Sequence, residues 1–133
     1  MILTILALAT AQADSSVDCN LERNHLEMAQ CELIDYQRAD ADINRQWHLA
    51  LVAARQFDRE NVDSIRRGQL RSLVENLRTA QRAWITYRDA HCDAEGRNYF
   101  GEATRYLIIN ICLRKLTEMR TQQLRGFSEG QTS

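Results

Sequence analysis

A chain of 133 residues is long enough to fold as one domain around a single core. It contains no proline and only five glycines, a composition that favours long helices and offers few turn signals for a sheet. Sixteen arginines and one lysine oppose eighteen carboxylates, so the net charge of -1 predicts no bulk attraction to nucleic acid or to an anionic membrane. We therefore expect an all-α protein that does not bind nucleic acid.

The first predicted element is an apolar segment, MILTILALATAQA, over residues 1–13. It ends in Ala11-Gln12-Ala13, the small-x-small pattern that a signal peptidase requires. We expect residues 1–13 to be a signal peptide and the mature protein to be periplasmic or secreted. A segment this short cannot span a bilayer. The alternative to a signal peptide is a buried N-terminal helix.

Four cysteines in a small exported chain predict two disulfides. Three pairings are possible. We favour Cys19 with Cys31 and Cys92 with Cys112, because each pair closes a short loop. The alternative is a metal site, but the chain has no C-x-x-C pair and its three histidines are dispersed, so we expect no bound metal and no cofactor.

A long first helix is predicted to begin at Asn24, whose side chain can cap it, with Glu27 completing a capping-box-like pair. Apolar residues then recur in steps of three and four, with one polar interruption at Asp40. The apolar positions are Ala29, Leu33, Tyr36, Ile43, Trp47, Ala50, Ala54 and Phe57.

Residues 58–63 are charged and predict a connection, after which Asp63 or Ser64 can cap a second helix. Gly68 weakens the first turns of this helix by about 1 kcal/mol relative to alanine, so its start can also lie beyond Gly68. The apolar positions of the second helix are Leu70, Leu73, Leu77, Ala80, Trp84, Tyr87 and His91.

Residues 92–101 include two glycines and predict a loop, followed by a third helix over 102–124 that Gly126 ends. The buried positions expected in it include Tyr106, Ile109, Cys112, Leu113, Leu116 and Leu124. Residues 128–133 are polar and predict a disordered tail. The predicted fold is therefore three long helices in an antiparallel, coiled-coil-like bundle with two disulfides, spanning residues 14–127.

Four segments of the chain resemble successive motifs of the LprI-type lysozyme-inhibitor family: CNLERNHLEMAQC, ADADIN, AQRAWITYRDAHC and CLRKLTEMRTQQL, at residues 19–31, 39–44, 80–92 and 112–124. Two departures are mild: Trp47 stands where the family usually has tyrosine, and Asn24 replaces a threonine cap. The resemblance implies an exported, disulfide-bonded helical domain and, for part of the family, inhibition of lysozyme. It transfers no functional residue to this chain.

Asp40 occupies a position where an apolar side chain is expected, and a buried carboxylate must find a partner or lose its charge. In an antiparallel pair of helices Asp40 lies near the second helix, so Asp40, Asn44, Gln81 and Arg88 can form one polar network. One interpretation is an acid or base site. We favour the other, a core network that fixes the register of the helices.

The aromatic residues Tyr36, Trp47, Trp84 and Tyr87 are predicted to lie in the core, because aromatic side chains at helical spacing are more often core than ligand pocket. No nucleophile, base and orienting group can be assembled from the sequence, so we predict no catalytic residue and a protein that is not an enzyme.

Charge is unevenly distributed along the chain. Residues 14–42 hold eight carboxylates and two arginines, whereas residues 55–88 hold eight arginines and four carboxylates. We favour an intramolecular explanation, in which antiparallel helices of opposite charge attract along their flanks. The alternative is that the acidic stretch docks a basic enzyme such as lysozyme.

Two functions follow. The first is a periplasmic or secreted binding protein that inhibits lysozyme by occluding it. The second is a structural or interaction module of the cell envelope that binds a different protein.

Overall fold

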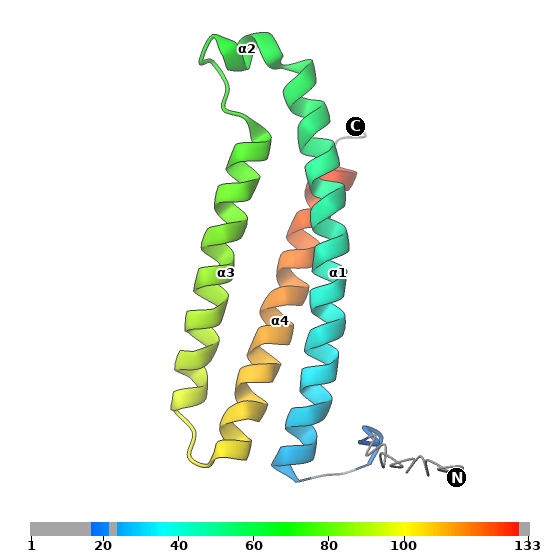
Figure 1. The fold of residues 1–133 in the computed structure, drawn as a ribbon, viewed down its shortest axis with the longest axis vertical. Coiled ribbons are helices and arrows are strands. Elements are labelled where there is room, and N and C mark those ends of the chain that lie inside the picture. The colour runs from blue at the N-terminus through cyan, green and yellow to red at the C-terminus, as the bar shows by residue number, and fades with distance from the viewer. Residues whose placement is uncertain (1–16, 22–23, 131–133) are drawn as a thin grey trace, which may run out of the picture.

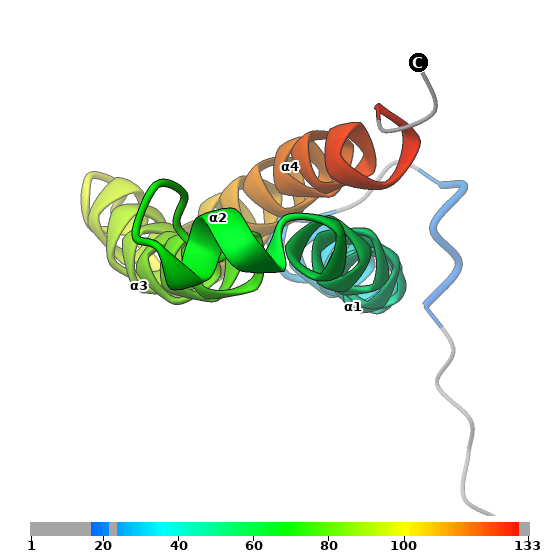
Figure 2. The ribbon, with the colours of Figure 1, turned by 90° about the horizontal axis from the view of Figure 1, so that it is seen from above.

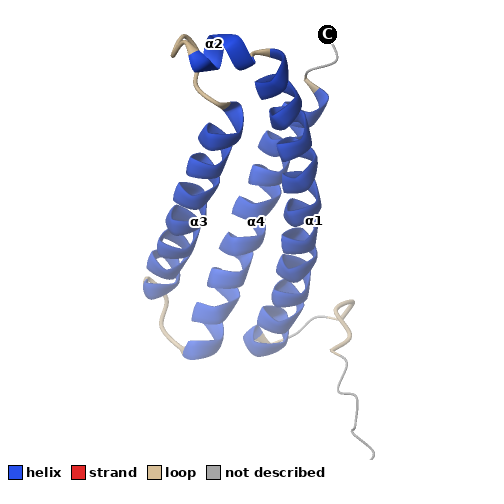
Figure 3. Cartoon of the chain, turned by 45° about the horizontal axis from the view of Figure 1, so that its top comes forward, coloured by secondary structure: helices blue, strands red, loops and turns tan. Residues whose placement is uncertain are grey.

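The computed structural model describes residues 17–21 and 24–130, and this part of the chain is helical, without strands (Figures 1 and 3). The helices are α1 (His25–Glu60), α2 (Val62–Arg66), α3 (Leu73–Arg97) and α4 (Glu102–Glu129). Helix α3 runs antiparallel to α1 and α4, which are parallel to each other (Figure 1). The all-α bundle is confirmed, and the short α2 was not predicted. The predicted signal peptide lies outside the described residues.

No helix in the described part of the chain is long and apolar enough to cross a membrane.

The start of α1 is where the sequence predicts it. The Asn24 side chain accepts hydrogen bonds from the backbone N–H groups of Leu26 and Glu27, both at 3.1 Å. The helix continues three residues past Phe57, to Glu60, and two of these residues, Arg59 and Glu60, are good helix formers.

The second long helix begins beyond Gly68, which was one of the two predicted starts, and Asp63 and Ser64 do not cap it. Those two residues belong to α2, which is followed by a turn at Gly68 with φ of 70°. Helix α3 begins at Leu73 and is capped by Ser72, whose hydroxyl accepts from the Glu75 N–H at 3.2 Å.

A second cap on α3 comes from α1. The Asp58 carboxylate accepts hydrogen bonds from the Leu73 N–H at 2.7 Å, the Val74 N–H at 3.3 Å and the Ser72 hydroxyl at 2.6 Å. Burial alone would raise the pKa of Asp58, but these three hydrogen bonds hold it below its ordinary value. A carboxylate at a helix N-terminus satisfies free N–H groups and interacts favourably with the helix dipole.

The connection between α3 and α4 is shorter than the predicted 92–101 loop, because α3 extends to Arg97. Gly96 lies inside α3, where a Cβ atom would come within 2.5 Å of Ile109 Cγ1. This glycine therefore serves a close approach of α3 to α4 and not a turn. Gly101, with φ of 87°, is the glycine that the turn requires.

The end of α4 was also placed too early. Gly126 lies within the helix, which continues to Glu129, so Ser128 and Glu129 are not part of a tail. The Ser128 hydroxyl accepts from the Gln46 side chain at 2.6 Å, and this contact fixes the last turn of α4 against α1. Residues 131–133 of the predicted tail lie outside the described residues.

The core lies mainly between α1 and α4, which pack against each other more extensively than either packs against α3. Small residues on α1 permit this contact: Ala50 and Ala54 are fully buried, as is Leu124 of α4. Trp47, Trp84 and Phe127 pack around a cluster of Ile43, Ala50 and Leu124.

Several predicted core positions are exposed instead, since α1 packs mainly against α4 and α3 packs less extensively against both. They are Leu33, Leu70, Ala80, Tyr87 and Tyr106.

The three long helices form a rod, and different elements make up its two ends (Figure 1). Helix α4 ends beside the middle of α1, so the last turns of α1, α2 and the start of α3 extend beyond it (Figure 1). Viewed along the rod, α2 lies across the end and joins α1 to α3 (Figure 2). We call residues 55–78 the α2 end.

Candidate functional site

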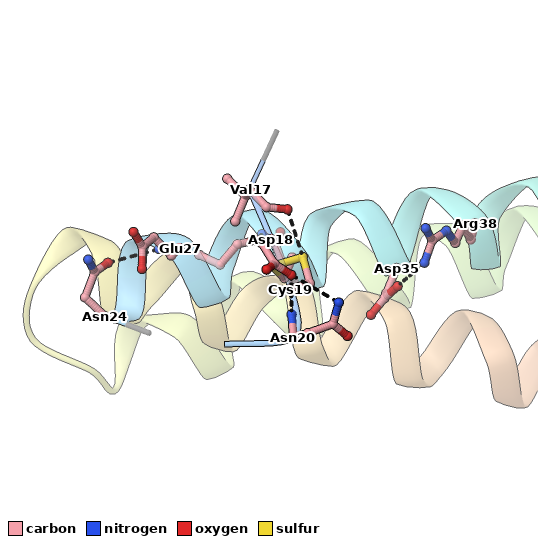
Figure 4. The surroundings of a disulfide bond; sticks show 11 residues. Val17, Asp18, Cys19, Asn20, Asn24, Glu27, Asp35 and Arg38 are labelled. Carbon is pink, nitrogen blue, oxygen red and sulfur yellow. Dashed lines mark hydrogen bonds and ion pairs between the residues drawn. A yellow bond between two sulfur atoms is a disulfide. The ribbon is translucent and has the colours of Figure 1, made fainter. Parts of the chain in front are cut away.

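Both predicted disulfides are present, Cys19–Cys31 and Cys92–Cys112, which confirms the favoured pairing. Both lie toward the end of the rod opposite α2. We call the described residues of 17–38 and 89–114 the disulfide end. The first disulfide attaches the segment before α1 to the side of that helix (Figure 4). The second joins α3 to α4.

The segment held by the first disulfide has its own short-range structure. Asp18 Oδ1 accepts hydrogen bonds from the backbone N–H of Asn20 at 3.0 Å and from its side chain at 3.1 Å (Figure 4). Asp18 and Asn20 are exposed, and the nearby Asp35 forms an ion pair with Arg38 at 2.8 Å. The disulfide therefore holds a polar, acidic segment on the surface of α1.

The connection between α3 and α4 presents two aromatic residues at the tip of this end. Phe100 is 98 % exposed and Tyr99 is also exposed. The base of the connection is held by the Cys92–Cys112 disulfide and by the close contact of Gly96 with Ile109. The backbone below the exposed aromatic pair is therefore held by contacts between α3 and α4.

Two hollows flank the tip and meet at Tyr106. The first, of about 380 Å³, is lined by Tyr99, Phe100, Gly101, Glu102, Arg105 and Tyr106. The second, of about 330 Å³, is apolar and lies between α1 and α4; its lining residues are Leu26, Ala29, Gln30, Leu33, Tyr106 and Asn110. The first hollow also has polar lining from Glu102 and Arg105, so exposed aromatic and aliphatic side chains lie beside charged groups, a mixture found in protein-binding sites.

Hydrogen bonds fix α4 to α1 beneath this surface. The Asn110 side chain donates to the Ala29 carbonyl at 2.9 Å, and His25 Nδ1 lies 2.7 Å from Thr104 Oγ1. The Glu32 carboxylate accepts from Arg114 at 2.7 Å, an ion pair that raises the pKa of Arg114 above its ordinary value.

Asp93 joins α3 to α4 at the same end. It accepts from Arg97 at 2.8 Å and from Arg105 at 3.1 Å, and these hydrogen bonds lower the pKa of Asp93 below its ordinary value. The disulfide end is therefore cross-linked by covalent and polar contacts between all three long helices.

The charge of the disulfide end is negative. Its described residues include eight carboxylates and four arginines, and each of the four arginines forms an ion pair with a carboxylate. The α2 end carries six arginines and four carboxylates. The rod is thus acidic at one end and basic at the other.

This arrangement corrects the favoured explanation of the uneven charge. Because α1 and α3 are antiparallel, the described part of the acidic stretch lies mostly toward the disulfide end and most of the basic stretch lies toward α2, and the two overlap only near the middle of the rod (Figure 1). Among described residues, the stretches share one ion pair, in which Arg88 Nη1 lies 3.9 Å from Asp40 Oδ1. Attraction between flanks therefore does not account for the pattern.

Of the predicted polar network, Asp40 lies beside Arg88, whose side chain is 10 % exposed. Its guanidinium lies 5.0 Å from the Trp84 ring centroid and 5.7 Å from that of Tyr36, and its Nε donates to Asp89 at 2.9 Å. Its Nη1 donates to Thr117 Oγ1 at 3.4 Å. Arg88 therefore joins α1, α3 and α4 near the middle of the rod.

The prediction that Asp40 is buried was wrong: its side chain is 46 % exposed, at the edge of the α1–α3 contact. Asn44, also exposed, donates to Asp40 at 3.4 Å. Gln81 does not join Asp40, because it accepts a hydrogen bond from Arg120 of α4 at 3.0 Å. Gln81 therefore faces α4, a contact that cannot be predicted by considering the first two long helices alone.

The four predicted core aromatics differ in position. Trp47 and Trp84 pack against the core cluster and Tyr36 is half-buried beneath Arg88. Burial raises the pKa of Tyr36 above its ordinary value, and the Arg88 charge offsets this only in part. Tyr87 is not in the core: it is 53 % exposed and stacks on His91 at 5.2 Å between centroids.

His91, Glu95 and Cys112 lie close together, with His91 Nε2 3.1 Å from Glu95 Oε1. Since the Cys112 sulfur is bonded to Cys92, it is not a thiolate that could bind a metal.

The tip and its two hollows were not predicted from the sequence. The signal was present as Asn98-Tyr99-Phe100-Gly101, an aromatic pair beside a turn glycine, where a loop would be expected to be polar.

The fold defines an all-helical bundle with two disulfides. The chain matches the family model described as "Lysozyme inhibitor LprI" over residues 19–124, and it belongs to that family. It is 33 % identical, over 132 residues, to an uncharacterized protein of Rhizobium meliloti (strain 1021), with 96 % of this chain and 92 % of the relative covered. No solved structure matches the chain. Membership of the family implies a lysozyme-inhibitor-type function and an inhibitor rather than an enzyme.

Proposed function

We propose that this protein acts outside the cytoplasm as an inhibitor that binds lysozyme with its disulfide end and occludes the saccharide cleft of the enzyme. The main support for this proposal is that two features occur at the same end of the rod. One is an excess of carboxylates, and the other is an exposed aromatic tip whose base is held by a disulfide. The two disulfides support an oxidising location, in agreement with the predicted export.

Charge supports the choice of the disulfide end over the α2 end. A basic lysozyme is attracted to the acidic end of the rod and repelled by the basic end, so the collision complex is oriented before contact. The net charge of -1 does not weaken this argument, because the potential near each end depends on the charges of that end.

The tip supplies the contact area. Phe100 and Tyr99 project from a narrow turn between two helices, a shape that can enter a cleft, whereas the flanking hollows can accept side chains from its rim. Large aromatic side chains at the centre of an interface contribute more binding energy than other residue types.

The test is inhibition of lysozyme on cell walls by the purified, oxidised protein. We expect inhibition at near-equimolar ratios that weakens when salt rises from about 20 to about 200 mM, because screening removes the long-range attraction. Phe100→Ala should weaken inhibition by about thirtyfold, the usual effect of losing an interface hot spot. Tyr87→Ala removes an exposed aromatic residue from the side of α3 and serves as the matched control.

Charge variants give a second comparison. Replacing Glu95 and Glu102 by glutamine should slow association with lysozyme, whereas the same change at Glu60 and Glu75, near the α2 end, should not. If the wild-type protein leaves lysozyme fully active at tens-fold excess and low salt, the proposal is wrong, and the protein is better regarded as an envelope module with a different partner.

A further inference from the structure

The α2 end of the rod carries a feature that lysozyme inhibition does not use: a group of arginines without ion-pair partners. Six arginines lie in this part of the chain, all exposed, namely Arg55, Arg59, Arg66, Arg67, Arg71 and Arg78. In the described part of the structure none of them forms an ion pair with a carboxylate. At the disulfide end, by contrast, all four arginines do so.

The carboxylates of the α2 end are in part committed elsewhere. Asp58 uses its two oxygens to cap α3, and Glu60 accepts a hydrogen bond from Gln56 at 2.9 Å. An anion that approaches this end therefore meets six guanidinium groups, none of them in an ion pair among the described residues, against four carboxylates, so this end has an excess of positive charge. Guanidinium groups bind phosphate through well-oriented pairs of hydrogen bonds.

Apolar side chains lie among these arginines. Val62 of α2 and Leu70 of the following loop are exposed, and Ile65 is half-buried between them in the chain. Helix α2 lies across the end of the rod, beyond the last turn of α4, so this mixed surface forms a blunt end cap (Figures 1 and 2). Arginines that surround a few exposed aliphatic side chains are typical of a surface that lies in the headgroup region of a bilayer.

We propose that the α2 end docks the protein on the surface of an anionic phospholipid bilayer. The bulk charge of -1 predicted no such attraction, but the separation of charge along the rod creates it locally: the basic end is attracted and the acidic disulfide end is repelled. The rod then stands with its aromatic tip directed away from the membrane, where it is free to meet a soluble enzyme. Docking does not require lysozyme inhibition and does not insert a helix.

The experiment measures co-sedimentation of the oxidised protein with vesicles at low salt. Vesicles with about 30 % phosphatidylglycerol in phosphatidylcholine are compared with phosphatidylcholine alone. We expect binding to the anionic vesicles only. Replacing Arg66, Arg67 and Arg71 by glutamine should weaken the affinity for these vesicles by at least about tenfold, since each basic residue near the surface adds to the attraction.

A matched variant replaces Arg38, Arg45 and Arg97 by glutamine, which removes the same charge from exposed sites away from the α2 end. It should retain binding, and far-UV circular dichroism should show that both variants are folded. The proposal is overturned if the wild-type protein does not bind anionic vesicles, if it binds neutral vesicles equally, or if both triple variants lose binding to the same extent. Equal competition by a soluble polyphosphate at matched phosphate concentration would also overturn it, in favour of a soluble polyanion as the partner.

Discussion

Removal of the Cys92–Cys112 disulfide tests how the bundle is held together at its disulfide end. The perturbation is the double variant Cys92→Ala, Cys112→Ala, which removes the bond with a small change in buried volume. The two residues are 20 apart in sequence, and the chain-entropy relation for a loop of this length gives a loss of about 3.3 kcal/mol in the free energy of unfolding. Because α3 and α4 remain packed in the folded state, little of this loss is recovered there.

The Cys19–Cys31 disulfide is the internal comparison. Its separation of 12 residues gives about 2.8 kcal/mol by the same relation. Residues 18–21 are exposed, so breaking this bond also frees the segment in the folded state, and the two entropy gains largely cancel. We therefore expect the double alanine variant at Cys19 and Cys31 to lose less than about 1 kcal/mol.

The assay is urea unfolding at neutral pH, followed by far-UV circular dichroism, with thiol titration to establish which disulfides remain. Equal losses for the two variants, or a larger loss on removal of Cys19–Cys31, would refute the reasoning, because the segment before α1 would then be part of the cooperative bundle.

Three further predictions concern single side chains. Replacing Asp58 by alanine should lower the free energy of unfolding by about 1 kcal/mol at pH 7, the usual effect of losing a helix cap. The pKa of Asp58 in the folded protein lies below the unfolded value of 3.8, so this stabilisation is present above pH 3.8 and is lost as the pH falls through the folded pKa. The unfolding free energies of wild type and variant should therefore converge in acid. Arg88→Met keeps much of the packing on Trp84 and leaves the exposed Asp40 solvated, so a loss of about 1–2 kcal/mol is expected in urea unfolding, and a loss above about 4 kcal/mol would show that a buried charge had been stranded. Gly96→Ala should lower the melting temperature despite the higher helix propensity of alanine, because its Cβ would overlap Ile109; a higher melting temperature would mean that α3 and α4 can separate at no cost.

The sequence was sufficient to predict the features that depend on local signals. Helical periodicity, the Asn24 cap and the even number of cysteines each act over a short stretch of chain, and the helical fold and both disulfides were predicted correctly. The start of α3 was predicted only as one alternative, beyond Gly68, because its cap comes in part from Asp58, which is 15 residues before Leu73 in the chain.

The positions of individual side chains depended on which helices pack together. Gln81 and Tyr87 were assigned to a contact between the first two long helices, yet the parallel α4 forms the main contact of α1. Gly96 was assigned to a loop, but it lies in a helix where Ile109 of α4 comes close. Such contacts join residues that are far apart in sequence, and periodicity within one helix does not identify its partner.

The most direct test of the central claim is the inhibition constant of the oxidised protein against a basic lysozyme on cell walls, measured for the wild type, Phe100→Ala and Tyr87→Ala. We expect inhibition by the wild type and the Tyr87 variant, and inhibition about thirtyfold weaker for the Phe100 variant. Equal inhibition by all three proteins would contradict the assignment of the aromatic tip, and no inhibition by any of them would contradict the proposed function itself.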